Sequence, residues 1–322
     1  MVKMTEFELI DRFFKRATTN HSFVDTGIGD DCALLQIPPG QQLAVTTDTL
    51  LSGVHFFADV DPFSLGHKVL AVNLSDLAAM AAQPRTVTLS LTLPDSNEGW
   101  LSEFCLGFFQ LADRFGVDLI GGDTTRGPLS ITVQAMGVVP AGLATRRNSA
   151  QPGDVLFVTG TIGDPGLALA HHYKKIQLSA ADFQLTSPKL NQPEPRVAQG
   201  LAVRRLASAA IDVSDGLLAD LGHLLAQSAV GAEMWADKVP LSSVAERFLA
   251  QDGDVGLLLT SGDDYELVFA VPPQNQKAFL AQMATTQCPV NAFGVITAET
   301  DFIVNYKGMK LSIERGGYNH FN

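Results

Sequence analysis

Hydrophobic and polar positions follow two distinct periods in the first half of the chain. Alternating or β-branched residues at 43–49, 86–93 and 131–139 predict three β-strands. Apolar residues at helical spacing predict a helix over 64–82, ended by Pro84, and a second over 97–115, ended by Gly116. Thr5 and Glu8 form a capping-box pattern in front of further apolar residues. A short amphipathic helix is therefore expected to open the chain.

A polar segment with proline and glycine, 146–154, separates this half from a second one. We therefore expect two domains, 1–148 and 149–322. The pattern of the second half predicts strands at 155–159 and 209–213, helices near 165–175, 194–207, 215–227 and 274–284, a hairpin-like pair of strands flanking 261–264, and short terminal strands. Helices and strands mix in both halves, with hairpins as well as crossovers, which favours an α+β fold.

Composition narrows the class of protein. The chain has 322 residues, of which 46% are hydrophobic and 17% charged, and this excludes a disordered acidic protein. A net charge of -12 argues against a broad surface for nucleic acid or anionic membrane. The start of the chain resembles no signal peptide, no run approaches the length of a membrane span, and the three cysteines lie far apart. We expect a cytoplasmic protein that binds neither membrane nor nucleic acid.

The acidic residues gather in short motifs, and most are expected at the end of a strand or in the turn that follows it. Ten of the 34 acids are in these motifs: Asp30, Asp31, Asp48, Asp76, Asp123, Asp212, Asp215, Asp263, Asp264 and Glu266. The remaining 24 acids nearly balance the 22 bases. The surplus negative charge is thus expected to belong mainly to one site.

Asp76 differs because it is expected in the middle of an apolar helix, where an unpaired carboxylate is costly. Asn73, one turn earlier, shares its face. Carboxylates brought together must take up protons or hold cations. Oxygen ligands without Cys or His favour Mg²⁺, whose coordination is commonly completed by substrate phosphates.

Simpler interpretations stay open for several of these residues. A single Asp in a turn is more commonly a cap, and for Asp30 capping or solvent exposure is the stronger interpretation. The turn at 159–166, TGTIGDPG, is a candidate for phosphate binding but more commonly just joins a strand to a helix. Arg126 and Arg147 are candidate phosphate clamps, with surface solvation as the alternative. No nucleophile and base stand together, which favours chemistry by bound metals and charge.

Six motifs together resemble the thiamine-monophosphate kinase family, in matching order over nearly the whole chain: GIGDDCALL, TTDTLxxGxHF, VNLSDLAAM, GGDTTRGPL, AIDVSDGLxxDL and GYNHF. The resemblance implies a two-domain fold of the aminoimidazole-ribonucleotide-synthetase type and a homodimer whose N-terminal sheets form a barrel. It also implies ATP-dependent phosphorylation of thiamine monophosphate to thiamine diphosphate, with several Mg²⁺ ions.

The resemblance also implies roles for individual residues. Metal ligands would be Asp31, Thr46, Thr47, Asp48, Asp76, Asp123, Asp212 and Asp215, with Asp48 and Asp212 the most critical. Gly122, Arg147 and Ser214 would contact ATP, and His55, Asp263 and Tyr318 would contact the thiamine phosphate. The family usually has Glu where this chain has Asp263, which is one methylene shorter, so that contact is expected to be longer or bridged by water.

Two other interpretations compete with this one. An ATP-using synthetase of the same fold, for aminoimidazole ribonucleotide or selenophosphate, would also have acidic strand ends, although the latter is expected to show Cys or Lys near its N-terminal glycine-rich segment. A noncatalytic binder of thiamine phosphates or divalent ions is the alternative from another class, but the chain has no EF-hand spacing.

Overall fold

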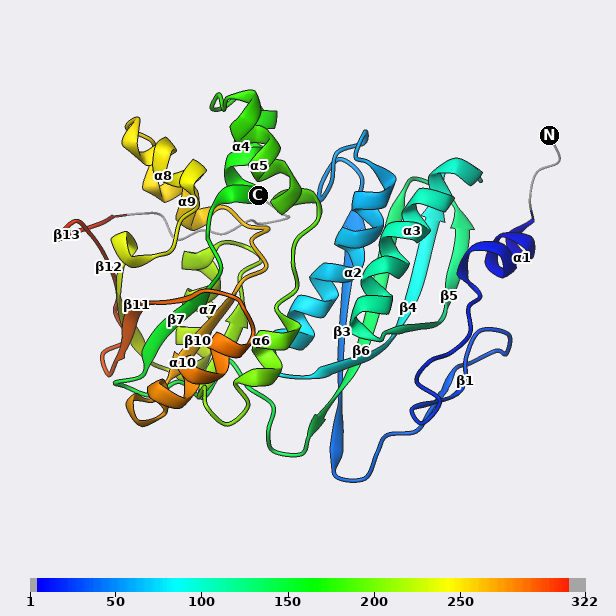
Figure 1. Ribbon diagram of the computed structural model, residues 1–322, viewed down its shortest axis with the longest axis horizontal. Helices are drawn as coiled ribbons and strands as arrows, with labels where there is room; N and C mark the ends of the chain where they lie inside the picture. The colour runs from blue at the N-terminus through cyan, green and yellow to red at the C-terminus, as the bar shows by residue number, and fades with distance from the viewer. Residues whose placement is uncertain (1–4, 313–322) are drawn as a thin grey trace. The chain divides into compact units, whose positions relative to one another are not determined.

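The computed structural model describes residues 5–312, with the side chain of Glu6 excepted. The chain forms two compact units (Figure 1). The N-terminal unit comprises Met1–Leu77 and Ala82–Gly142, and the C-terminal unit comprises Ala78–Ala81 and Leu143–Asn322. Both units combine a mixed sheet with helices, as expected for an α+β fold.

A four-stranded sheet forms the centre of the N-terminal unit. Its strand order is β3 (Gln41–Leu51), β6 (Ser130–Pro140), β4 (Gln83–Leu93) and β5 (Asp118–Arg126). The β4 and β5 strands run parallel and the other pairs run antiparallel. A parallel pair needs a crossover connection, and α3 (Glu98–Phe115) supplies it. The strands predicted at 43–49, 86–93 and 131–139 are confirmed, whereas β5 was not predicted.

One face of this sheet is covered by α2 (Pro62–Ala79), whose Leu77 side chain lies beside Gly137 of β6. Gly116 ends α3 in the left-handed conformation, as predicted. The role expected for Pro84 is wrong, because α2 already ends at Ala79 and Pro84 lies inside β4. On the uncovered face of β3, at the sheet edge, Leu43 and Val45 are 41% and 54% exposed.

Short elements precede this sheet: α1 (Glu6–Leu9), the π-helical turn η1 (Ile10–Phe14), β1 (Val24–Thr26) and β2 (Leu34–Leu35). The backbone N–H of Thr5 donates to Glu8 Oε2 at 2.8 Å, and the N–H of Glu8 donates to Thr5 Oγ1 at 3.4 Å. The predicted capping box is therefore confirmed.

A seven-stranded sheet forms the centre of the C-terminal unit. Its order is β13 (Met309–Lys310), β12 (Phe302–Tyr306), β9 (Gly231–Trp235), β11 (Val290–Thr297), β7 (Val155–Thr159), β10 (Leu267–Val271) and β8 (Ala209–Asp212). Only the β12–β9 pair is parallel among these described strands. The predicted strand at 155–159 is confirmed at both ends.

Helices pack on both faces of this second sheet. Accordingly, β10 is buried at every position and β7 at every position except Val155. Leu156 and Val158 face the cluster that contains the buried residues of α7 (Leu217–Ser228). Phe157, on the opposite face, packs against Phe279 of α10 (Gln276–Thr285), with 4.9 Å between the ring centroids and the rings tilted by 43°. The alternation of side chains along one strand thus fixes which helix covers which face.

The remaining elements are α4 (Asp164–His172), α5 (Ala180–Asn191), α6 (Val197–Ala202), α8 (Ser243–Ala250), α9 (Val255–Thr260) and the 3₁₀ turns η2 (Ala236–Lys238) and η3 (Pro273–Asn275). The hairpin predicted around 261–264 is wrong. Helix α9 precedes this segment, and β10, which follows it, pairs with the distant strands β7 and β8. Asp263 and Tyr265 have left-handed φ values of +69° and +50°, which interrupt any strand there.

Candidate active site

The helix α2 and the edge strand β3 bring two candidate metal ligands together in the N-terminal unit. Thr46 Oγ1 donates to Asp76 Oδ2 at 2.5 Å. Asp76 lies in the middle of the helix, as predicted, and its surroundings are almost fully buried. Asn73, one turn earlier, is fully buried, and its Oδ1 has no hydrogen-bond partner among the described residues. The helix therefore places the side-chain oxygens of Asp76 and Asn73 in surroundings that are otherwise apolar.

Strand alternation divides the TTD motif between two faces. Thr46 faces α2, so Asp48 lies on the same face and Thr47 on the opposite, exposed one. Thr47 Oγ1 donates to the carbonyl of Val133 at 3.2 Å. The expectation that most of the acids follow a strand is wrong for two of them, because Asp48 lies within β3 and Asp123 within β5.

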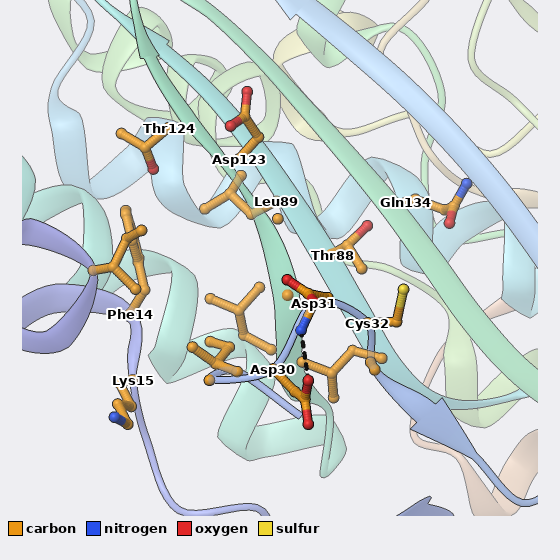
Figure 2. A pocket seen from close by; sticks show the side chains of 18 of the residues that line it. Phe14, Lys15, Asp30, Asp31, Cys32, Thr88, Leu89, Asp123, Thr124 and Gln134 are labelled. Carbon is orange, nitrogen blue, oxygen red and sulfur yellow. Dashed lines mark hydrogen bonds between the residues drawn. The ribbon is translucent and has the colours of Figure 1, made fainter. Parts of the chain in front are cut away.

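A pocket of about 760 Å³ in the N-terminal unit contains a second group of candidate residues. Figure 2 shows it between the loop that follows β1, the strands β4, β5 and β6, and the end of the N-terminal helical segment. Asp31, Gly122 and Asp123 line it together. In Figure 2 the Asp31 side chain points toward the part of the pocket that contains Thr88, and Asp30 points the other way.

Asp30 has the structural role that its simpler interpretation gave it. Its side chain is exposed, and its Oδ1 accepts the backbone N–H of the next residue, Asp31, at 2.9 Å (Figure 2). Gly122 has φ +153°, and a Cβ atom there would lie 1.9 Å from the carbonyl oxygen of Leu89. Only glycine allows β5 to approach β4 this closely at the pocket.

His55 lies in the turn that follows β3. Its Nδ1 accepts the backbone N–H of Leu51 at 3.0 Å, so the neutral ring carries its proton on Nε2. The buried Lys68 of α2 donates from Nζ to the carbonyl of His55 at 3.3 Å. This turn therefore holds His55 as an N–H donor, which is the form that can bind a phosphate oxygen.

In the C-terminal unit, Asp212 ends β8, as predicted for the acids of the motifs. Its side chain is 3% exposed and lies 3.9 Å from the guanidinium of Arg147, measured from Oδ1 to Nη2. Arg147 is 48% exposed, and the hydroxyl of Ser228 donates to its carbonyl at 2.7 Å. A buried carboxylate and an accessible arginine therefore stand together at the end of one strand.

Asp220, on the first turn of α7, organises the loop that follows Asp212. Its Oδ2 accepts the backbone N–H groups of both Ser214 and Asp215 at 2.9 Å. Burial raises the pKa of the Asp220 carboxyl to about 7, and the charge of Asp215 adds to this shift, while the two N–H donors oppose it. Sequence reasoning gave Asp220 no role, although it is the third Asp of the DVSDGLLADL motif.

The segment that carries Asp263 packs directly on this loop. The N–H of Asp263 donates to the carbonyl of Ser214 at 2.8 Å. A Cβ atom on Gly262 would lie 2.2 Å from the same carbonyl oxygen, so the contact requires glycine. A candidate nucleotide contact and a candidate substrate contact are thus joined through the backbone.

Two further acids of this segment are buried. Glu266 forms a bidentate ion pair with Arg196, at 2.5 Å from Nη2 to Oε1 and 2.6 Å from Nε to Oε2, and accepts the hydroxyl of Thr159 at 2.6 Å. Asp264 accepts the N–H of Gly163 at 2.8 Å, and its Oδ2 has no partner among the described residues. Burial raises the pKa of Asp264 well above its usual range, and the neighbouring carboxylates add to the shift.

The turn at 159–166 is a structural turn, in agreement with the simpler interpretation of its sequence. The N–H groups of Gly160, Ile162 and Gly163 donate to Pro289, Pro240 and Asp264 respectively. These groups are therefore satisfied by the protein instead of being offered to a phosphate. Arg126 likewise donates to the carbonyl of Pro94 at 3.3 Å.

The donor chemistry of the candidate ligands fits Mg²⁺, because every one supplies oxygen. Over residues 5–312 no three His, Cys, Asp or Glu side chains approach closely enough to hold a metal ion. Six of the candidate ligands belong to the N-terminal unit and two, Asp212 and Asp215, to the C-terminal unit. Tyr318 lies outside the described residues.

Comparison with known proteins identifies the family. The models for AIR synthase related protein match residues 29–139 for the N-terminal domain and residues 151–307 for the C-terminal domain. The thiamine-monophosphate kinase of Salmonella typhimurium is 44% identical over 318 residues, which are 98% of each chain. This chain belongs to the thiamine-monophosphate kinase family.

Solved structures agree with this membership. The crystal structure of thiamine-monophosphate kinase from Stenotrophomonas maltophilia K279a has 45% sequence identity and a TM-score of 0.85, and the match covers 95% of this chain and 97% of that one. A structure of AaThiL complexed with AMPPCP and TMP has 28% identity and a TM-score of 0.77 over the full length of both chains. The two-domain fold and the resemblance of the motifs are therefore confirmed. Among the described helices, none is both long enough and apolar enough to cross a membrane.

Proposed function

We propose that this protein transfers the γ-phosphoryl group of ATP to thiamine monophosphate and so forms thiamine diphosphate and ADP. The observation that carries the proposal is the full-length similarity to thiamine-monophosphate kinases, together with a similar structure that is complexed with AMPPCP and TMP. The six motifs that led to the same prediction are distributed along the chain, and the similarity covers 98% of that chain.

The reaction forms one bond and breaks one. An oxygen of the thiamine phosphate attacks the γ-phosphorus, the bond from that phosphorus to the β,γ-bridging oxygen breaks, and ADP leaves with the electron pair. The acceptor is a phosphate monoester with a second pKa of about 6, so it is largely a dianion near neutral pH and needs no general base. The chain therefore has to align two polyanions instead of activating a nucleophile.

Named residues would share this task. Metal ions would be held by Asp31, Thr46, Thr47, Asp48, Asp76, Asp123, Asp212 and Asp215, with Asp48 and Asp212 the most critical. When bound at these residues, Mg²⁺ would supply the positive charge that stabilises the negative charge developing in the transition state. The fully oxygen-based donor set and the hydrogen bond from Thr46 to Asp76 support this assignment.

The contacts to the two substrates are assigned on similar grounds. Gly122, Arg147 and Ser214 would contact ATP, and the exposed guanidinium of Arg147 suits a phosphate. His55 would donate its Nε2–H to the thiamine phosphate, as its hydrogen bond from Leu51 favours. Asp263 would face the cationic thiazolium ring, and Tyr318 would complete that contact through its aromatic ring.

We also propose a homodimer in the cytoplasm. The uncovered face of the edge strand β3 exposes Leu43, Val45 and Leu51, which would be buried if two N-terminal sheets joined into a barrel. The three cysteines are free, which suits a reducing compartment. A domain boundary at 148/149 would fall in the stretch that neither family model matches.

An assay with several acceptors tests the function against its rivals. Purified protein with ATP and Mg²⁺ should release ADP with thiamine monophosphate, and the product should be thiamine diphosphate. Thiamine, selenide and the formylglycinamidine ribonucleotide used by aminoimidazole-ribonucleotide synthetases should give background rates. If one of these three compounds gives a faster rate than thiamine monophosphate, the proposed function is wrong. Binding of thiamine monophosphate without any ADP release would favour a noncatalytic binder.

A further inference from the structure

Asp220 is not one of the proposed metal or substrate contacts. However, it is buried, with 3% of the residue exposed, and its carboxylate accepts hydrogen bonds from two residues that the proposed function uses, Ser214 and Asp215. Both hydrogen bonds, from the N–H groups of Ser214 and Asp215, end on the same oxygen, Oδ2, at 2.9 Å. Two successive backbone groups directed at one fixed atom leave the intervening peptide little freedom. The buried carboxylate therefore sets the conformation of the loop.

The backbone of Asp220 is also held in place. Its backbone N–H donates to the carbonyl of Gly216 at 3.0 Å, within the first turn of α7. Gly216 has φ +112°, and a Cβ atom there would lie 2.6 Å from the carbonyl oxygen of Thr260. The loop is thus held between the start of α7 and the end of α9.

The constraint continues into the segment of the proposed substrate contact. Ser214 uses its N–H for Asp220 and its carbonyl for the N–H of Asp263. Val213 and Glu266 extend this pairing, because the N–H of Val213 donates to the Glu266 carbonyl at 2.8 Å. Any displacement of Ser214 would therefore move Asp263 as well.

We propose that Asp220 is a positioning residue of the kinase, which holds Ser214 and Asp215 in place for nucleotide and metal through its Oδ2 and, through Ser214, fixes Asp263. This inference rests on the proposed function but concerns a residue outside the proposed contact set. The chemistry requires a hydrogen-bond acceptor and not a charge, because one oxygen serves both donors.

Three variants of Asp220 show whether its hydrogen-bond acceptor or its charge is required. D220N keeps an oxygen that can accept both bonds, whereas D220A and the larger D220L remove it. D154A is the matched control, since Asp154 is also a buried carboxylate of the C-terminal unit but accepts from Gln151 and Ser208, which are not in the proposed site. Each variant is compared with wild type in turnover, half-saturating Mg²⁺, melting temperature and hydrogen exchange of residues 213–216.

We expect D220A and D220L to lose about tenfold or more in kcat/KM for ATP and to need several-fold more Mg²⁺, as is typical when the support of a metal ligand is removed. Residues 213–216 should exchange faster in both variants. D220N should stay within about threefold of wild type, because its amide oxygen can accept both hydrogen bonds. D154A should lower the melting temperature without these changes.

The proposal is overturned if folded D220A or D220L keeps at least half of the wild-type kcat/KM, if D220N loses as much as D220A, or if D154A shows the same loss. If neither D220A nor D220L folds, wild-type exchange decides, and unprotected amides at 214 and 215 overturn the proposal. Wild-type turnover in the same assay reports the proposed function separately, and hydrogen exchange tests the role of Asp220 even if that turnover is absent.

Discussion

Removing either partner of the Arg196–Glu266 ion pair should strongly destabilise the C-terminal unit. The two side chains are 14% and 5% exposed, and they are joined by two hydrogen bonds. Breaking such a pair leaves one buried charge uncompensated, which costs about 3–5 kcal/mol. At roughly 2–4 °C for each kcal/mol in a unit of this size, R196M or E266Q should lower the melting temperature by roughly 6–20 °C.

Urea unfolding, followed by tryptophan fluorescence, measures this loss of stability in the C-terminal unit. The chain has two tryptophans, Trp100 in the N-terminal unit and Trp235 in the C-terminal unit, so a W100F background leaves Trp235 as the reporter. The double variant R196M/E266Q should lose at least about 1 kcal/mol less than the sum of the single variants, because the two residues interact. A surface pair provides the control.

The control variant is R247M, which removes the ion pair of Arg247 with Asp182. Arg247 is 50% exposed, so this change should cost less than about 1 kcal/mol. The reasoning is refuted if R196M and E266Q cost no more than R247M, or if the effects of R196M and E266Q are additive in the double variant. Either result would mean that burial does not make the loss of one partner of the ion pair more costly to the free energy of unfolding.

Other expected outcomes concern the proposed site. D48N and D212N should each lower turnover by about tenfold or more with a similar or raised melting temperature, since each removes a proposed ligand and its charge repulsion; a variant that loses stability and keeps activity would support a structural role. The pKa of Asp264 is raised on folding, so wild type should lose stability as pH rises above the usual aspartate range near 3.8, and D264N should make the fall of the urea midpoint between pH 5 and 8 less steep; parallel midpoints would contradict this. G262A should reduce both activity and stability, because its Cβ would collide with the carbonyl of Ser214; unchanged kinetics would show that the two loops separate without consequence.

Much of the fold could be predicted because hydrophobic periodicity decides long buried elements. The strands β4 and β7 and the helix α3 lie where their patterns place them, and Gly116 ends α3 as its backbone freedom allows. Strand β5 was missed because its second half, GGDTTR, is polar and rich in glycine. It lies at the sheet edge beside the pocket, where little apolar packing is needed to hold it.

The candidate site could be predicted only as a set of residues. The motifs identified Asp212 and Asp263 as candidates. The hydrogen bond that joins Ser214 to the Asp263 segment depends on the left-handed backbone of Asp263 and Tyr265, which no local sequence pattern predicts. Asp220 was missed because a role through backbone N–H groups leaves no signature in residue type. Positioning residues are therefore the part of a site that requires coordinates.

The transfer of label from ATP tests the central claim most directly. With γ-labelled ATP, Mg²⁺ and thiamine monophosphate, the folded protein should place the label in the terminal phosphate of thiamine diphosphate, with none retained on the protein. Absence of labelled thiamine diphosphate would contradict the kinase assignment, and label trapped on the protein would contradict direct transfer.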